Sequence, residues 1–170
     1  MKLNLGCGSK LLMGYTNVDV CGSPDLLCDL SHFPWPFDTE SIDEVYSEHF
    51  LEHVVDYEKT VLEMHRILRA GGIIHFKVPH FRSMYFPWHL HNYAFSSVTC
   101  RLLCEGRPYQ FGGQQLFEEV SLRFNYPYLT SKIVNKCFTF LANKFQSKWE
   151  YLGFPIDEIE FIARKMAIEI

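Results

Sequence analysis

Two glycines and two aspartates near the N-terminus are of the residue types that a nucleoside-binding site requires. The apolar run at residues 3–5 ends at Gly6-Cys7-Gly8, and the next run, at 17–20, contains Asp19. A third short run, at 25–29, ends at Asp29. Glycine lets the backbone pass close under a ligand. The Asp19 carboxylate can accept hydrogen bonds from two ribose hydroxyls, and Asp29 can accept one from an amino group such as that of adenine.

The spacing of these residues argues against a dinucleotide. The G-x-G-x-x-G fingerprint needs a third glycine at position 11, which is Leu11, and an acidic residue about 20 positions further on. Here Asp19 follows Gly8 after a much shorter segment. Such a loop leaves little room for a helix whose N-terminus binds a pyrophosphate. The pattern therefore favours a nucleoside cofactor without a phosphate group.

A second group of reactive side chains lies in the segment 80–93. It contains histidines, an arginine and aromatic residues: His80, Arg82, Tyr85, Trp88, His89, His91 and Tyr93. Histidine titrates near neutral pH, so His89 or His91 is the predicted general base. His80, Arg82, Tyr85 and Trp88 are the predicted substrate residues. A metal at His89-x-His91 is the alternative, as is a structural role, but the sequence identifies no third ligand, so no metal site is predicted.

The elements that position these residues alternate along the chain. Strands are predicted at 3–5, 17–20, 25–29, 42–47, 73–79, 116–124 and 158–168, and helices at 56–69, 96–104 and 131–149. Asp56 is the expected cap of the first helix, the glycines at 71 and 72 its end, and His53 the start of a helical segment. Alternating strands and helices predict an α/β fold with a mostly parallel sheet covered on both faces, as one domain over residues 1–170. Ligands bind such sheets at the carboxyl ends of the strands.

Composition excludes several classes of protein. The chain has 170 residues, 48% of them hydrophobic, and a net charge of −4, so no basic nucleic-acid surface is expected. No apolar run approaches the about 20 residues that span a bilayer, and no signal peptide is evident. The six cysteines form no C-x-x-C pair. A cytoplasmic protein with reduced thiols is predicted.

Four segments together resemble one family. They are "LNLGCG", "NVDV", "CDLSHFPWPFDTESIDEVYSEHFLEHV" and "EMHRILRAGGIIHFKVP". In this order they are similar to the class I S-adenosylmethionine-dependent methyltransferases of the small type 11 pattern. The resemblance implies a Rossmann-like, doubly wound sheet of seven strands that ends in an antiparallel pair, with an insert at about 129–154 between the last two strands.

The resemblance also implies roles for single residues. Gly6 and Gly8 would lie under the methionine part of the cofactor, Asp19 would hold the ribose, and Asp29 would hold the adenine. The full cofactor set that it implies is Gly6, Cys7, Gly8, Asp19, Val20, Asp29, Leu30, Ser47, Glu48 and His49.

The expected reaction is methyl transfer from S-adenosylmethionine to a small-molecule or sugar-like acceptor, with S-adenosylhomocysteine as product. The first alternative is a non-catalytic subunit that serves a partner enzyme, and the second is an RNA or protein methyltransferase. The chain begins at its first strand without helices that would cover the pocket. A homodimer, a partner subunit or the insert is expected to complete it.

Overall fold

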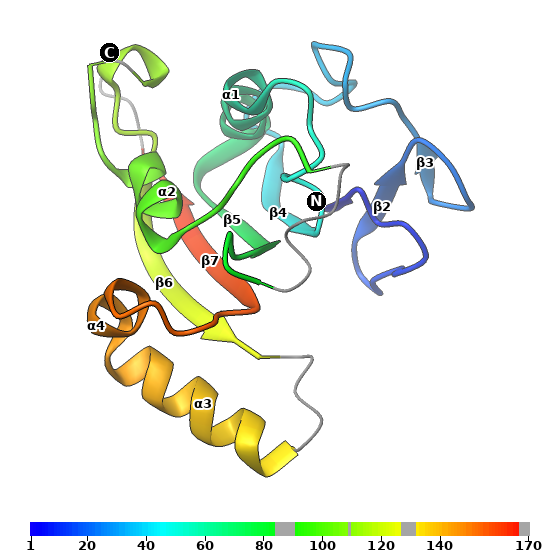
Figure 1. Ribbon diagram of the computed structural model, residues 1–170. Coiled ribbons are helices and arrows are strands. Elements are labelled where there is room, and N and C mark those ends of the chain that lie inside the picture. The colour runs from blue at the N-terminus through cyan, green and yellow to red at the C-terminus, as the bar shows by residue number, and fades with distance from the viewer. Residues whose placement is uncertain (84–90, 109, 127–131, 167–170) are drawn as a thin grey trace.

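A computed structural model describes residues 1–83, 91–108, 110–126 and 132–166. Its centre is one sheet of seven strands, in the order β3-β2-β1-β4-β5-β7-β6 (Figure 1). The strands are β1 (Lys2–Leu5), β2 (Thr16–Asp19), β3 (Leu26–Leu27), β4 (Ile42–Glu48), β5 (Leu68–Pro79), β6 (Phe117–Asn125) and β7 (Glu158–Lys165). β1 to β5 run parallel to their neighbours, whereas β7 is antiparallel to both β5 and β6. The Rossmann-like sheet with an antiparallel C-terminal pair is confirmed.

The helices follow the fourth strand and those after it. They are α1 (Tyr57–Ile67), α2 (Ser97–Arg101), α3 (Lys132–Lys144) and α4 (Gln146–Tyr151), with 3₁₀ turns at Leu102–Cys104 and Phe111–Gly113. The Asp56 side chain caps α1 by accepting a hydrogen bond from the Lys59 N–H, and Ser96 caps α2. None of the helices in the described ranges is long and apolar enough to cross a membrane.

Three predicted boundaries are wrong in detail. The glycines at 71 and 72 do not end a helix, because α1 stops at Ile67 and β5 already begins at Leu68. Leu68 pairs with Ile42 before an irregularity in the β4–β5 register, and Gly71 there has φ +74°. The predicted helix at 131–149 is two helices, because the backbone leaves the helical region at Phe145. His53 does not begin a helix but lies in a turn, where its N–H donates to the Phe50 carbonyl.

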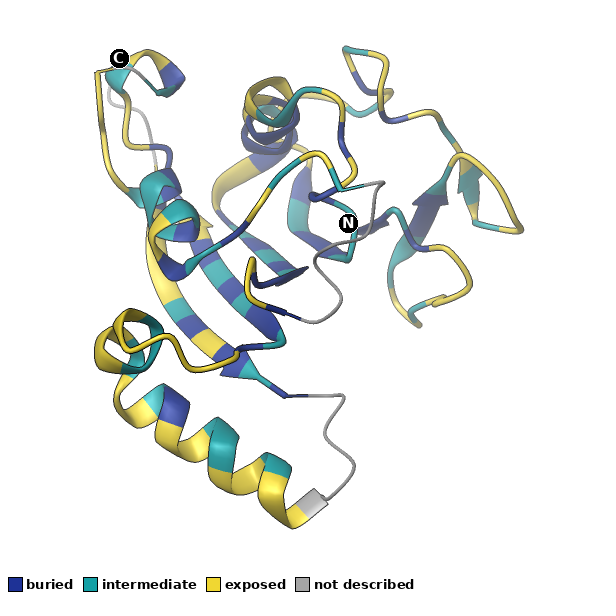
Figure 2. Ribbon diagram, in the orientation of Figure 1, coloured by how far each residue is buried: buried dark blue, intermediate teal, exposed yellow. Residues whose placement is uncertain are grey.

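One face of the sheet carries the apolar core. Along β5 the side chains of Ile74, Phe76 and Val78 are fully buried, and they alternate with partly exposed residues (Figure 2). Val61 and Met64 of α1 belong to the same buried cluster. Successive side chains of a strand point to opposite faces. This face is therefore the one against which α1 packs.

The opposite face is polar, which corrects the expectation that helices cover both sides. Glu44 on β4 accepts hydrogen bonds from the Lys2 ammonium at 2.7 Å and from the Tyr15 hydroxyl at 2.6 Å. His75 on β5 lies 2.9 Å from Glu160 on β7. Residues 1–41, all of them described, contain no helix. The connections between β1, β2, β3 and β4 are loops, and a loop of this kind lacks the apolar stripe with which a crossover helix would cover the sheet.

The insert between β6 and β7 covers the edge of the sheet. β6 is the last strand in the order, so one row of its backbone groups has no neighbouring strand. The Asn143 side chain accepts from the Phe124 N–H at 2.9 Å and donates to the Phe124 carbonyl at 2.8 Å, while Gln146 donates to the Leu122 carbonyl at 2.6 Å. These side-chain amides form hydrogen bonds with backbone groups of β6 that could otherwise pair with a strand of another molecule. In Figure 1, α3 lies alongside β6 accordingly.

The Glu150 carboxylate ties α4 to the rest of the fold. It lies 2.9 Å from Nε2 of the buried His80, accepts from the Ser97 N–H at 3.0 Å and also binds the Ser97 hydroxyl. Ser97 is the first residue of α2, where a backbone N–H has no partner within the helix. Burial of the Glu150 carboxyl, which would raise its pKa, is outweighed by the hydrogen bonds from His80 and Ser97, so its pKa falls to about 2.

We expect the contacts of Glu150 to make the stability of the fold depend on pH in the acidic range. Because the folded-state pKa of Glu150 is about 2 and the ordinary value is 4.5, its stabilisation is present above pH 4.5 and is lost as pH falls towards 2. Glu150→Gln should lower the free energy of unfolding by about 2 kcal/mol at pH 7 and by much less at pH 3. Urea unfolding of both proteins at the two pH values measures the difference.

Glu118→Gln is the matched control, since the Glu118 side chain is 65% exposed and lies 4.0 Å from Arg164. It should cost less than about 0.5 kcal/mol at either pH. A cost of Glu150→Gln that stays constant between pH 7 and pH 3 would contradict the assignment of the low pKa to this contact.

Candidate functional site

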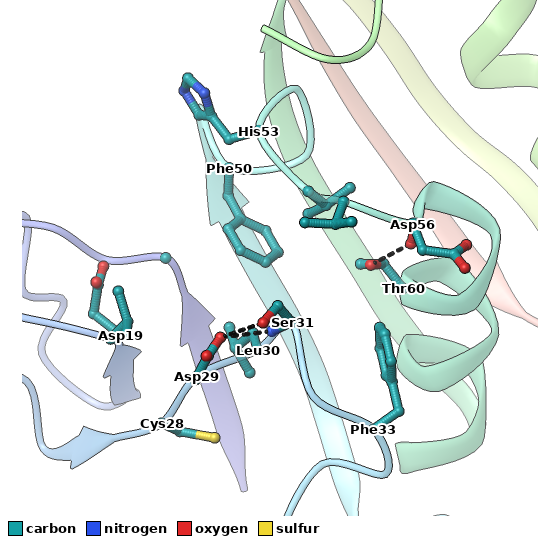
Figure 3. A pocket seen from close by; sticks show the side chains of 14 residues that line it. Asp19, Cys28, Asp29, Leu30, Ser31, Phe33, Phe50, His53, Asp56 and Thr60 are labelled. Atoms are coloured by element: carbon teal, nitrogen blue, oxygen red, sulfur yellow. Dashed lines mark hydrogen bonds between the residues drawn. The ribbon is translucent and has the colours of Figure 1, made fainter. Parts of the chain in front are cut away.

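A cavity opens where β1, β2, β3 and β4 end. It comprises about 590 Å³ of empty space, a figure that includes the solvent at its open mouth. The residues that line it all follow the carboxyl ends of these strands or begin α1: Gly6, Asp19, Val20, Cys28, Asp29, Leu30, Ser31, Phe33, Phe50, His53, Val54, Val55, Asp56 and Thr60 (Figure 3). This is the edge at which ligands of parallel sheets bind.

Asp19 is held in place by the backbone of the two loops beside it. One carboxylate oxygen accepts from the Gly8 N–H at 2.8 Å, and the other accepts from the Cys21 N–H at 3.2 Å. Each carboxylate oxygen has two lone pairs, so the oxygen bound to Gly8 can accept a further hydrogen bond. The other oxygen also accepts a weak hydrogen bond from the Cys21 thiol at 3.7 Å, which an incoming hydroxyl group can replace.

Asp29 forms the neighbouring part of the wall. Its carboxylate accepts from the Ser31 N–H at 2.9 Å and the Ser31 hydroxyl at 2.7 Å, and it lies 2.9 Å from His32 Nδ1. Hydrogen bonds from Ser31 lower the pKa of Asp29, so it is ionised at neutral pH. The adjacent Leu30 is buried, and its carbonyl accepts from the Trp35 indole at 3.0 Å.

Phe50 lies across the glycine turn. Figure 3 shows its ring projecting from the end of β4 toward Leu30 and Ser31. Gly6 has φ +63°, and a Cβ atom built there would lie 2.5 Å from Phe50 Cδ2. Only a residue without a side chain therefore allows this ring to pack on the turn. Cys7, by contrast, is a buried packing residue, and burial together with the charge of Asp19 raises the pKa of its thiol.

The predicted residues at the end of β4 lie beside the cavity and do not line it. Ser47 is buried within the sheet. Glu48 binds Lys10 and the Tyr46 hydroxyl, and these bonds outweigh the effect of burial and lower its pKa. His49 has φ +53° and lies 3.2 Å from Glu52 and 3.3 Å from Glu158.

His49 is consequently a cation at neutral pH. Its hydrogen bonds to Glu158 and Glu52 raise its pKa to about 9. An imidazolium has no free lone pair, so His49 cannot act as a general base in this state. A non-glycine residue in the left-handed region is a strained conformation of the kind that gathers at functional sites.

The histidine segment divides into three parts. Tyr85, Trp88 and His89 lie outside the described residues. His80 is fully buried against Glu150, and the Arg82 guanidinium binds the Glu150 carbonyl, so the structure does not bring these two to the cavity. His91 does approach it, because its ring centroid lies 4.9 Å from that of His53, a lining residue.

The sequence did not predict two groups of lining residues: those in the turn after β4 and those in the loop after β3. Phe50, His53, Val54 and Val55 come from one turn, and Ser31 and Phe33 come from the loop after β3. The available signal was the pair of valines before the Asp56 cap. Neither valine belongs to a helix or strand; Val54 is buried, Val55 is exposed, and both line the cavity.

The fold and this cavity define a class I methyltransferase domain. The two strand-end carboxylates and the glycine turn supply the acceptor oxygens and the close backbone approach that an adenosine requires, and so they fit the cofactor of that class. Residues 3–76 match the family model of the type 11 methyltransferase domain. Over residues 3–76 the chain therefore carries the pattern of an S-adenosylmethionine-dependent methyltransferase domain.

Solved structures share the fold at low sequence identity. One belongs to the complex between the Haloferax volcanii Trm112 methyltransferase activator and a methyltransferase, with 15% identity, a TM-score of 0.64 and coverage of 99% of this chain and 83% of that one. An Archaeoglobus fulgidus SAM-dependent methyltransferase has 17% identity, a TM-score of 0.58 and coverage of 96% and 85%.

A third similar structure is bound to ligands. Haemonchus contortus phosphoethanolamine N-methyltransferase 2, in complex with phosphomonomethylethanolamine and S-adenosylhomocysteine, has 17% identity, a TM-score of 0.58 and coverage of 97% of this chain and 48% of that one. No curated protein sequence matches the chain.

Proposed function

We propose that this methyltransferase acts on a small-molecule or sugar-like acceptor and holds its cofactor in the cavity at the ends of β1 to β4. The observation that carries the proposal is that Asp19 and Asp29, from adjacent strands, line one cavity together with Gly6. S-adenosylmethionine supplies an electrophilic methyl group on a sulfonium. Asp19 would bind the ribose, Asp29 with Leu30 and Val20 would enclose the adenine, and Gly6 would allow close approach of the methionine part.

The lining of the cavity supports a small acceptor. Phe33, Phe50, Val54 and Val55 give it an apolar wall, and polar side chains are confined to a few places. Small-molecule sites have this composition. The net charge of −4 opposes a polyanionic acceptor such as RNA. His89 and His91 remain the predicted bases, since the charged His49 cannot fill that role.

Titration calorimetry of the full chain with S-adenosylmethionine and S-adenosylhomocysteine tests the cofactor site. Transfer of labelled methyl groups to small-molecule extracts, sugars, transfer RNA and protein pools then tests the acceptor class. We expect micromolar binding of both cofactor forms and label in the small-molecule fraction. Label in RNA or protein alone would overturn the acceptor class.

A partner subunit is the second candidate, favoured by the polar, helix-free face of the sheet and by the activator-bound relative. Residues 1–41 place no helix on that face, and the Haloferax volcanii protein is solved with a methyltransferase activator. If the folded chain alone binds neither cofactor form, the enzyme needs a partner to complete its pocket. Micromolar binding by the isolated monomer, with its mass measured by ultracentrifugation, would contradict this candidate.

A further inference from the structure

Three metal-ligating side chains converge at the rim of the cavity. Glu52 and His53 lie in the turn after β4, and His91 comes from the segment before α2. One ligand atom from each lies within 4.8 Å of the other two. The sequence offered no third ligand for His91. The fold brings two to it.

Backbone hydrogen bonds hold the two segments together. The Asn92 and Tyr93 N–H groups donate to the Glu52 carbonyl at 2.7 and 3.3 Å, and the Asn92 side chain donates to the carbonyls of His53 and Val54, each at 3.1 Å. The imidazole rings of His53 and His91 meet at an angle of 68°. The approach of the three side chains is therefore built into the backbone.

The Glu52 carboxylate supplies an independent observation. Its side chain has no exposed surface, and Oε1 lies 3.2 Å from His49 Nδ1 and 3.9 Å from His53 Nε2. The other oxygen, Oε2, is buried and has no hydrogen-bond partner among the described residues. A buried polar atom of this kind costs free energy unless a donor or a cation reaches it.

We propose that Glu52, His53 and His91 bind a divalent transition-metal ion, with zinc the best match. Two imidazoles and one carboxylate form the ligand set of zinc sites that keep an open position. A tetrahedral ion with bonds of about 2.1 Å places its ligand atoms about 3.4 Å apart. Small rotations of the side chains bring the three atoms to that separation. The His53 side chain is 42% exposed, so water can reach the cluster from the His53 side.

A neighbouring cluster is less suited to a metal. Glu48, His49 and Glu158 also lie within 4.8 Å of one another. Their groups are already engaged, because His49 pairs with Glu158 at 3.3 Å and Glu48 binds Lys10 and Tyr46. That cluster is an internal ion-pair network, and it serves as the comparison for the test.

The position suggests what the ion does, a step that rests on the proposed function. His53 also lines the cofactor cavity, so a metal bound there would coordinate an acceptor hydroxyl at the cavity mouth and favour its deprotonation. The acceptor oxygen then forms a bond to the methyl carbon as the carbon–sulfur bond breaks, and the hydroxyl proton passes to water. In this arrangement His91 is a metal ligand and no longer a candidate base, which leaves His89 as the predicted base. The proposed metal therefore limits the methyl acceptors to molecules with an oxygen atom that can bind a metal ion.

Zinc chloride titrated into the chelator-treated full chain measures the site directly, and cobalt absorption reports its ligands. We expect one ion per chain and a cobalt spectrum without a thiolate charge-transfer band. Glu52→Gln, His53→Ala and His91→Ala should each weaken zinc binding by about 100-fold or more, since even outer-shell changes cost up to that amount. His32→Ala, which alters a histidine 83% exposed on the surface, and Glu158→Gln should retain it.

Each other outcome overturns the proposal. Loss of binding in Glu158→Gln alone would move the ion to the neighbouring cluster, and loss in Cys21→Ser or Cys137→Ser would assign it to exposed thiols. If the folded chain binds no zinc, the proposed metal site does not exist. S-adenosylhomocysteine titration without metal separates the two proposals, because its failure contradicts a complete cofactor site in the isolated chain and leaves the zinc result unchanged.

Discussion

Asp19→Ala should weaken binding of S-adenosylhomocysteine by about 100-fold, because two charge-assisted hydrogen bonds to the ribose together contribute about 3 kcal/mol. Asp19 lines the cavity, and its carboxylate is already oriented by the Gly8 and Cys21 N–H groups. Little conformational freedom is lost when the ligand binds, so the full effect should appear as affinity. Titration calorimetry measures it.

The control for Asp19→Ala is Asp38→Ala, which removes the same charge from an exposed residue outside the cavity. We expect its affinity for S-adenosylhomocysteine to match that of the unaltered chain. Because Asp19 also anchors two loops, thermal unfolding of both variants shows whether the protein remains folded. Unchanged affinity of a folded Asp19→Ala variant would remove Asp19 from the cofactor site.

Gly6→Ala should destabilise the fold more than Gly8→Ala, although both glycines have positive φ. A Cβ on Gly6 would lie 2.5 Å from the Phe50 ring, whereas one on Gly8 meets no atom within 4 Å. The left-handed backbone alone costs about 1–2 kcal/mol for alanine, and the collision adds about 1–3 kcal/mol. Urea unfolding should give losses of about 3 kcal/mol for Gly6→Ala and about 1 kcal/mol for Gly8→Ala.

A double-mutant cycle with Phe50→Ala isolates the collision. Phe50→Ala removes the ring atoms nearest to the new Cβ. The loss of unfolding free energy caused by Gly6→Ala should therefore be smaller, by at least about 1 kcal/mol, in the Phe50→Ala background. The same cycle with Gly8→Ala should show additive costs, since Gly8 does not touch the ring. Equal losses for the two glycine variants would mean that the Phe50 ring does not pack on the turn.

The site residues that could be predicted from the sequence are those at the ends of predicted strands. Asp19 and Asp29 could be placed because the carboxyl ends of parallel strands share one edge of the sheet. Phe50, and the pairing of His53 with His91, could not be placed. They depend on how two distant segments dock, through hydrogen bonds between Asn92 and the Glu52 turn. A backbone contact of this kind leaves no periodicity in the sequence.

The uncovered sheet face could have been predicted from the strands themselves. Strands buried on both sides are nearly continuous apolar runs, whereas those with one solvated face alternate. In β5, His75 and Lys77 alternate with Phe76 and Val78, and in β7 Glu160 lies between two buried residues. We predicted helices on both faces from the order of elements, and this alternation already contradicted it.

The polar face also limits how this protein can be recombined with others. Lys2, Glu44, His75 and Glu160 place charged or titratable groups on four neighbouring strands, in the pairs Lys2–Glu44 and His75–Glu160. A chimera that grafts crossover helices onto this face would press their apolar stripes against these groups and desolvate them. The strand residues would have to be exchanged together with the helices. A functional chimera therefore needs either this polar face without added helices or a matched exchange of strands and helices.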